Sequence, residues 1–308
     1  MVLDVPKKLS LQSIRDALIR QEDTIIFALI ERAQFMCNDV CYVQGAPQFG
    51  GVAGPSESFL ESMLLETERT HARVRRYTAP DEHAFFPERL PAPALPLIEF
   101  PELLNPCNVN LNSQILKVYL SKVLPAVCRA GDDEQHGSSV VADVSVLQAI
   151  SKRVHYGLFV AESKFRSQPD EYTRLIQAAD EAGIMALLTN MAVEEKVVRR
   201  VRRKAQTFGQ DIEADDAAPA PADAALKLDP EAIVQLYHDF IIPLTKEAEV
   251  AYLMQRLGNT RVAYHGSADG SCYQLAVQHF DHKVRAQPYA PKSSRHTPGP
   301  MTPDPGPP

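Results

Sequence analysis

The chain has 308 residues, enough for one large domain or two ordinary ones, and its 45% hydrophobic content is sufficient for a core. It carries 32 Lys and Arg against 39 Asp and Glu, and this net charge of −7 gives no general reason to expect nucleic acid as a partner. Because no apolar run approaches the length of a signal peptide or a membrane span, we expect a cytoplasmic protein with no membrane partner.

The cysteines give no sign of a disulfide framework or a metal site. They number five and contain no CxxC pair. Cys37 and Cys41 could meet on one helix, but no cluster of His or Cys completes a set of metal ligands. We therefore expect reduced thiols and no bound metal.

The first part of the chain predicts two helices and an irregular connection. Residues 9–36 have apolar side chains at a spacing of three to four, with Ser10 as N-cap, and residues 56–77 predict a second helix opened by Ser56. Residues 80–106 contain seven prolines, which excludes a regular helix or a central strand. We expect an extended connection there, anchored by apolar side chains: Phe85, Phe86, Leu95, Leu97 and Ile98.

Helical patterns then dominate the middle of the chain. They cover residues 111–128 and 139–166, and paired segments follow at 170–188 and 189–208. Residues 209–225 are acidic and rich in Ala and Pro, which is typical of a surface loop.

The last predicted helix begins with Asp229 as its cap and Pro230 in its first turn, and it runs to about Leu257. The remainder holds eight of the 24 prolines and shows no sustained periodicity. No strand alternation or fixed-period repeat is evident, so we expect an all-α domain over residues 1–258 and a Pro-rich, disordered tail over 259–308.

Two cations lie on one side of a predicted helix, beside its apolar stripe. Arg153 and Lys164 are eleven residues apart, which at ~100° per residue is three turns and brings them within ~20° of one azimuth. Arg15 similarly follows the apolar Ile14 on the first helix. A single helical arginine is usually solvated or extends its charge to the surface, so spacing alone gives no function.

Two polar pairs repeat the same kind of arrangement. Asn190 and Glu194 are four residues apart, as are Thr245 and Glu249 on the last helix, so each pair faces one way. Most such pairs lie on a solvated surface. Periodicity by itself therefore indicates only a large all-α domain.

The order of these segments resembles the all-helical chorismate mutases of yeast and plants. The resemblance runs from about Leu9 to Leu257, and the motifs that carry it include LQSIRDALIRQEDTIIFALIERAQF, ARVRRYTAPDEHAFFPERLP, HGSSV, SKRVHYGLFVAESKF, LLTNMAVEEKV and IIPLTKEAEVAYLMQRL. It implies an all-α homodimer of about a dozen helices per chain with one active site per subunit. The reaction would be the Claisen rearrangement of chorismate to prephenate, in phenylalanine and tyrosine biosynthesis, without metal, cofactor or covalent intermediate.

The resemblance also implies roles for the cations. Chorismate is a dianion, and Arg15 and Arg153 match the positions whose guanidinium groups hold its two carboxylates. The C–O bond breaks ahead of C–C bond formation, so negative charge develops on the ether oxygen. Lys164 and Glu249 match the cation and the hydrogen-bond donor that stabilise this charge in the transition state.

Further contacts follow from the same match. Glu194 corresponds to the acceptor for the ring hydroxyl, and Asn190 and Thr245 to other polar contacts with the substrate. Glu249 can donate only when it is protonated, so its pKa must be raised by burial or by the charges of the substrate, against the effect of neighbouring Lys164.

This family implies regulation by tyrosine, which inhibits, and tryptophan, which activates, at a dimer-interface site. Arg75 and Arg76 match the cations of one subunit, and Gly137 and Ser138 match a helix start of the other, where backbone N–H groups suit a carboxylate. The apolar faces of the first helix and of residues 56–74 are the expected dimer contact. Three positions depart from the yeast pattern: Gln135, Val141 and Asp229.

Three other interpretations remain at this stage. Residues 194–204 carry six basic side chains and could bind nucleic acid or an acidic membrane, although valines occupy the apolar face of this helix and the whole chain is acidic. A non-catalytic helical scaffold could keep the fold, but the complete set of catalytic positions argues against it. A secreted mutase is disfavoured by the lack of a signal-like segment.

Overall fold

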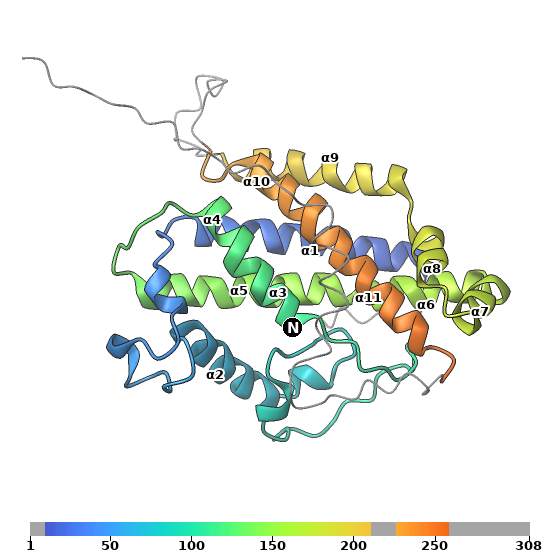
Figure 1. The fold of residues 1–308 in the computed structure, drawn as a ribbon, viewed down its shortest axis with the longest axis horizontal. Helices are drawn as coiled ribbons and strands as arrows, with labels where there is room; N and C mark the ends of the chain where they lie inside the picture. Colours follow the sequence, from blue (N-terminus) through green and yellow to red (C-terminus); the bar gives the residue numbers. More distant parts are fainter. Residues whose placement is uncertain (1–9, 211–225, 259–308) are drawn as a thin grey trace, which may run out of the picture. The chain divides into compact units, whose positions relative to one another are not determined.

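The computed structural model describes residues 10–210 and 226–258, and in these ranges the chain is all-α, with two isolated β-bridges and no strand. Two long helices, α1 and α5, lie side by side at the centre (Figure 1). They run antiparallel: Arg32 at the end of α1 pairs with Asp143 in the first half of α5. The start of α1 therefore lies beside the end of α5. The expectations for residues 259–308 and for most of 209–225 lie outside the described ranges.

The helices number fewer than expected. Tyr156 alone separates α5 from α6, and π-helical turns join α3 to α4 and α10 to α11, so the eleven α-helices of the described ranges form eight rods rather than about a dozen. The bounds are α1 Leu11–Arg32, α2 Phe59–Arg73, α3 Asn112–Val118, α4 Leu124–Val127, α5 His136–His155, α6 Gly157–Ser167, α7 Pro169–Gln177, α8 Glu181–Leu188, α9 Met191–Phe208, α10 Pro230–Gln235 and α11 Ile242–Gln255. No described helix has the length and apolar character needed to cross a membrane.

Side-chain caps fix several helix starts. Ser10 accepts from the Ser13 N–H at 3.1 Å, which confirms the predicted cap of α1, and Asp229 likewise accepts from Glu231 before α10. The predicted cap Ser56 is wrong. Ser58 caps α2, because it forms a reciprocal capping box with Glu61, which the SFLE segment allows and Ser56 does not.

The stretch expected to be one helix over 139–166 is two. The first, α5, begins earlier, at His136, and ends at His155. Tyr156 keeps a helical φ of −63° with ψ of −15°, and the Phe159 N–H bonds to its carbonyl, three residues back. The axis is therefore only locally disturbed, and α6 continues from Gly157.

Two prolines explain the two π-helical turns. Pro125 and Pro243 each stand just after such a turn, which covers Tyr119–Val123 in one rod and Leu236–Ile241 in the other. A proline inside a helix has no N–H and its ring crowds the carbonyl four residues back, which here lies within the widened turn. The widening lets each rod pass its proline without breaking.

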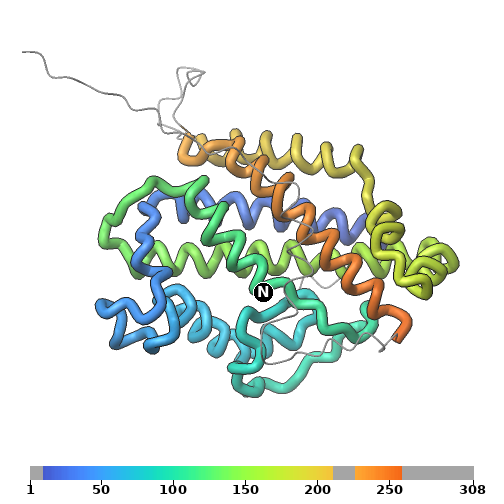
Figure 2. The backbone as a smooth tube through the Cα atoms, viewed as in Figure 1, coloured from blue at the N-terminus to red at the C-terminus, as the bar shows by residue number. Residues whose placement is uncertain are grey.

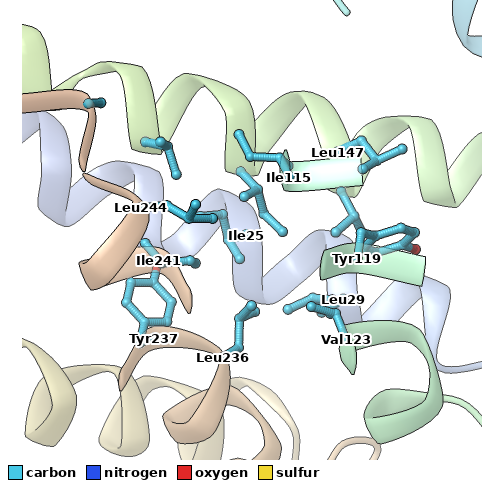
Figure 3. Packing of buried hydrophobic residues seen from close by; sticks show 14 of the residues in the cluster. Ile25, Leu29, Ile115, Tyr119, Val123, Leu147, Leu236, Tyr237, Ile241 and Leu244 are labelled. Carbon is cyan, nitrogen blue, oxygen red and sulfur yellow. The ribbon is translucent and has the colours of Figure 1, made fainter. Parts of the chain in front are cut away.

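The core lies where these two rods cross α1 and α5. Figure 3 shows Ile25 of α1 and Leu147 of α5 facing Ile115 and Leu244, all less than 9% exposed. An ion pair, Arg32 with Asp143, is buried as well. The Asp143 carboxylate accepts from Arg32, Tyr42 and Tyr119 and ties α1 to α5 and to the α3 rod.

The proline-rich connection between α2 and α3 is extended, as expected, and passes along one side of the bundle (Figure 2). Its predicted anchors are only partly right. Glu68 of α2 accepts from the backbone N–H groups of Phe85 and Phe86, which fixes that end. Three other predicted anchors are instead exposed: Leu95, Leu97 and Ile98.

Candidate active site

The antiparallel pairing of α1 and α5 brings Arg15 and Arg153 to one cavity of about 310 Å³. Arg15 lies near the start of α1 and Arg153 near the end of α5, so 138 positions of sequence separate two side chains that line the same space. The third wall is α9, which contributes Val193, Lys196 and Val197. Arg153 is buried and Arg15 is exposed, and two guanidinium groups that face one cavity suit an anionic ligand with two carboxylates.

The Arg153 side chain is held by a hydrogen bond to α11. The side chain is 5% exposed, and its Nη1 donates to Thr245 Oγ1 at 3.3 Å. Thr245 in turn donates to the Ile241 carbonyl at 2.6 Å, so its hydroxyl is fixed in α11. The Arg153 Nε has no hydrogen-bond partner among the described residues. A buried donor left in this way favours a polar ligand at the site.

Lys164 and Glu249 meet across the α6–α11 contact. The Lys164 ammonium donates to the Leu188 carbonyl at 2.6 Å and lies 3.6 Å from Glu249 Oε2, beyond hydrogen-bond distance. Glu249 is 5% exposed, and its Oε2 is also without a hydrogen-bond partner in the described part of the chain. The contact therefore places a cation beside a buried carboxyl group.

The protonation of Glu249 is set by competing influences. Burial raises its pKa to about 7, although the positive charges of Lys164, Arg153 and Lys246 act to lower it. At neutral pH a large share of the side chain is thus a neutral carboxylic acid, which can donate a hydrogen bond.

The N-terminus of α9 carries the last pair of predicted site residues. Asn190 caps the helix, since its Oδ1 accepts from the Val193 N–H at 3.2 Å. Glu194, one turn later, pairs with Lys246 of α11 at 3.2 Å. Six of the seven predicted residues fall on α1, α5, α6, α9 and α11, and Asn190 is the N-cap of α9. A shared cavity and a hydrogen bond connect Arg15, Arg153 and Thr245. Lys164 and Glu249 form a separate contact and do not line that cavity, although the charge of Arg153 acts on the Glu249 carboxyl group. No ion-ligand cluster of three His, Cys, Asp or Glu occurs in the described ranges.

Comparison with known proteins identifies the family. The family model for chorismate mutase type II matches residues 138–250. The chain is 44% identical over 257 residues to the chloroplastic chorismate mutase 1 of Petunia hybrida, an alignment that covers 83% of this chain and 78% of the relative. The chain belongs to the chorismate mutase family.

Solved structures of chorismate mutases also have the same fold. The Aro7p enzyme of Candida albicans, in complex with L-tryptophan, has a TM-score of 0.74 and 42% identity, and the match covers 81% of this chain and 92% of that one. The AtCM1 enzyme with tyrosine in its allosteric site has a TM-score of 0.72 and 40% identity, over 80% of this chain and 96% of that one. Both of these relatives carry a bound aromatic amino acid.

Arg75 and Arg76 lie just after α2. Arg75 has a φ of 61°, a left-handed conformation that ends the helix, and its Nη1 donates to the Pro96 carbonyl at 2.5 Å. Arg76 donates to Glu82 at 3.0 Å and to Gln148 of α5 at 2.9 Å. Both guanidinium groups thus have partners within the chain.

Gly137 and Ser138 form the first turn of α5 and are exposed. First-turn N–H groups and the positive end of the helix dipole suit a carboxylate.

Several charged groups at the cavity were not predicted. Glu22 of α1 is buried on its wall, and Arg200 of α9 binds it in a bidentate pair at 2.5 and 2.7 Å. Glu22 lies seven residues after Arg15, two helical turns along the same face, and this spacing was an available signal. Nothing in the local sequence links Arg200 to Glu22, because 178 positions separate them.

Proposed function

We propose that this cavity binds chorismate and rearranges it to prephenate. The arrangement of Lys164 and Glu249 carries the proposal, because a cation and a carboxyl group with a pKa of about 7 are placed at one point in a largely buried site. These are the two groups that an ether oxygen needs when it takes up negative charge. A metal or redox cofactor has no part in such a rearrangement.

The chain has two tasks in this reaction: it binds the substrate in its reactive conformer, and it stabilises the transition state. Arg15 and Arg153 bind the two carboxylates, and so select the folded conformer in which the reacting carbons approach each other. As the C–O bond breaks and the C–C bond forms within the same molecule, Lys164 and protonated Glu249 stabilise the ether oxygen. Both contacts strengthen as charge develops, and this difference between ground state and transition state is the source of the rate.

The remaining polar residues orient the ring. We propose that Glu194 accepts from the ring hydroxyl while its ion pair with Lys246 holds it in place. Asn190 and Thr245 supply further polar contacts at two sides of the site. The hydrogen bond from Arg153 to Thr245 supports this, because it holds the guanidinium group in one position before substrate binds.

Regulation belongs to the same proposal. We propose that tyrosine inhibits and tryptophan activates through a homodimer, in which Arg75 and Arg76 of one subunit and the start of α5 of the other hold the amino acid. The ligands of the Candida albicans and AtCM1 structures support the kind of effector. An effector carboxylate at Arg76 would have to share that guanidinium group with Glu82, which gives the effector a way to act on the chain.

The direct test is turnover of chorismate by the purified protein. We expect chorismate absorbance to fall and prephenate to appear without added metal or cofactor. The matched control is Arg153→Lys, which keeps the charge but loses the planar fork, and it should bind chorismate more weakly. Absence of turnover in folded protein, with and without tryptophan, would refute the proposed function.

A further inference from the structure

Gly157 lies between the two cations of the site and on the same face. Arg153, Gly157 and Lys164 stand at i, i+4 and i+11, and all three face α11. Arg153 contacts Thr245, Lys164 contacts Glu249, and Gly157 lies against both of these α11 residues. The glycine therefore occupies the centre of the contact that assembles the site.

The contact leaves no room for a side chain. A Cβ added at Gly157 would lie 2.8 Å from Thr245 Cγ2, 3.0 Å from the Thr245 carbonyl oxygen and 3.3 Å from Glu249 Cγ. Thr245 cannot easily turn aside, since its hydroxyl is bonded to the Ile241 carbonyl and to Arg153. A larger residue would therefore move α11 away from α6.

Backbone conformation does not explain the glycine. Gly157 is helical, with a φ outside the left-handed region, so an alanine could adopt the same conformation. Glycine weakens a helix relative to alanine, because it loses more conformational freedom on folding. The reason for glycine at this position is thus the close approach of α11.

We infer that Gly157 is a positioning residue of the mutase reaction: its missing side chain sets how near Glu249 and Thr245 lie to Lys164 and Arg153. The inference rests on the proposed function. Gly157 touches no substrate; it acts through two residues that do. Because electrostatic catalysis depends on donors held in place, a small displacement of α11 lowers the rate.

The test is Gly157→Ala measured for kcat and KM separately. We expect kcat to fall ~10- to 100-fold, the size of effect that a displacement near 1 Å produces, with KM within about threefold, because Arg15 and Arg153 remain to bind the carboxylates. Gly51→Ala is the matched control. Its added Cβ meets no heavy atom within 4 Å, and both kinetic constants should stay within about twofold of the parent.

The substitution Thr245→Ser tests whether crowding against Thr245 causes the loss of kcat in Gly157→Ala. It removes Cγ2, the atom nearest the added Cβ, and keeps the hydroxyl. The loss of kcat caused by Gly157→Ala should therefore be smaller in the Thr245→Ser background than in the parent. If Gly157→Ala alone fails to fold, the double variant is compared with Thr245→Ser instead. Multiplicative losses, or a parental kcat for Gly157→Ala, would overturn the inference. A parent without activity would instead refute the proposed function.

Discussion

The role proposed for Glu249 makes a quantitative prediction about pH. Only the protonated side chain can donate to the ether oxygen, and burial raises its pKa to about 7. The competent fraction should therefore fall from ~0.9 one pH unit below this pKa to ~0.1 one unit above it. The ratio kcat/KM, which reports the pKa values of the unliganded enzyme, should decline by roughly tenfold over that interval, on the alkaline side of the profile.

Glu249→Gln is the matched perturbation. The amide has a similar size and keeps an N–H donor at every pH, so the variant should hold its activity to higher pH than the parent, whatever its absolute rate. The assay is kcat/KM from acid to alkaline pH, measured with chorismate well below KM. Superimposable profiles for parent and Glu249→Gln would refute the assignment of Glu249 as the titrating donor.

Other charged and titratable groups near Glu249 could also affect the pH profile. Lys164, Arg153 and Lys246 act on the Glu249 carboxyl group, and burial also raises the pKa of nearby Tyr172 to about 12. Tyr172 therefore stays neutral where Glu249 titrates. Lys164→Arg keeps the charge but not the contact of a compact ammonium, so it should lower the rate while leaving an alkaline decline in place.

Three further predictions follow from the structure. Arg153→Ala should lose about 2–5 kcal/mol of transition-state binding, measured as kcat/KM, while its circular dichroism stays that of the parent; near-parental turnover would remove Arg153 from the site. Deleting residues 265–308 should leave turnover largely unchanged, because every proposed site residue lies before them; a collapse of activity or melting temperature would show that they dock. Asp143→Ala should destabilise the fold by about 3–5 kcal/mol in denaturant unfolding, since it leaves the buried Arg32 without its ion partner, and a loss under about 1 kcal/mol would contradict that role.

The cavity could not be located from local spacing. Residues such as Arg153 and Lys164 reveal a shared face, because an α-helix repeats every 3.6 residues, but spacing says nothing about which distant segment covers that face. Only the antiparallel packing of α1 on α5 brings Arg15 to Arg153. The pairs Glu22–Arg200 and Glu194–Lys246 likewise join helices whose relation has no local signal.

The sequence by itself determined the all-α class, the caps at Ser10 and Asp229 and the irregular proline-rich connection, because periodicity, caps and proline act within a few residues. The seven site positions came from the resemblance of ordered motifs to a family. Tertiary structure decided the local form of two predicted helices, since π-helical turns let the segments 111–128 and 229–257 pass Pro125 and Pro243. It also decided the protonation of Glu249 and the need for glycine at 157, because burial and close helix approach arise only when α6 and α11 pack together.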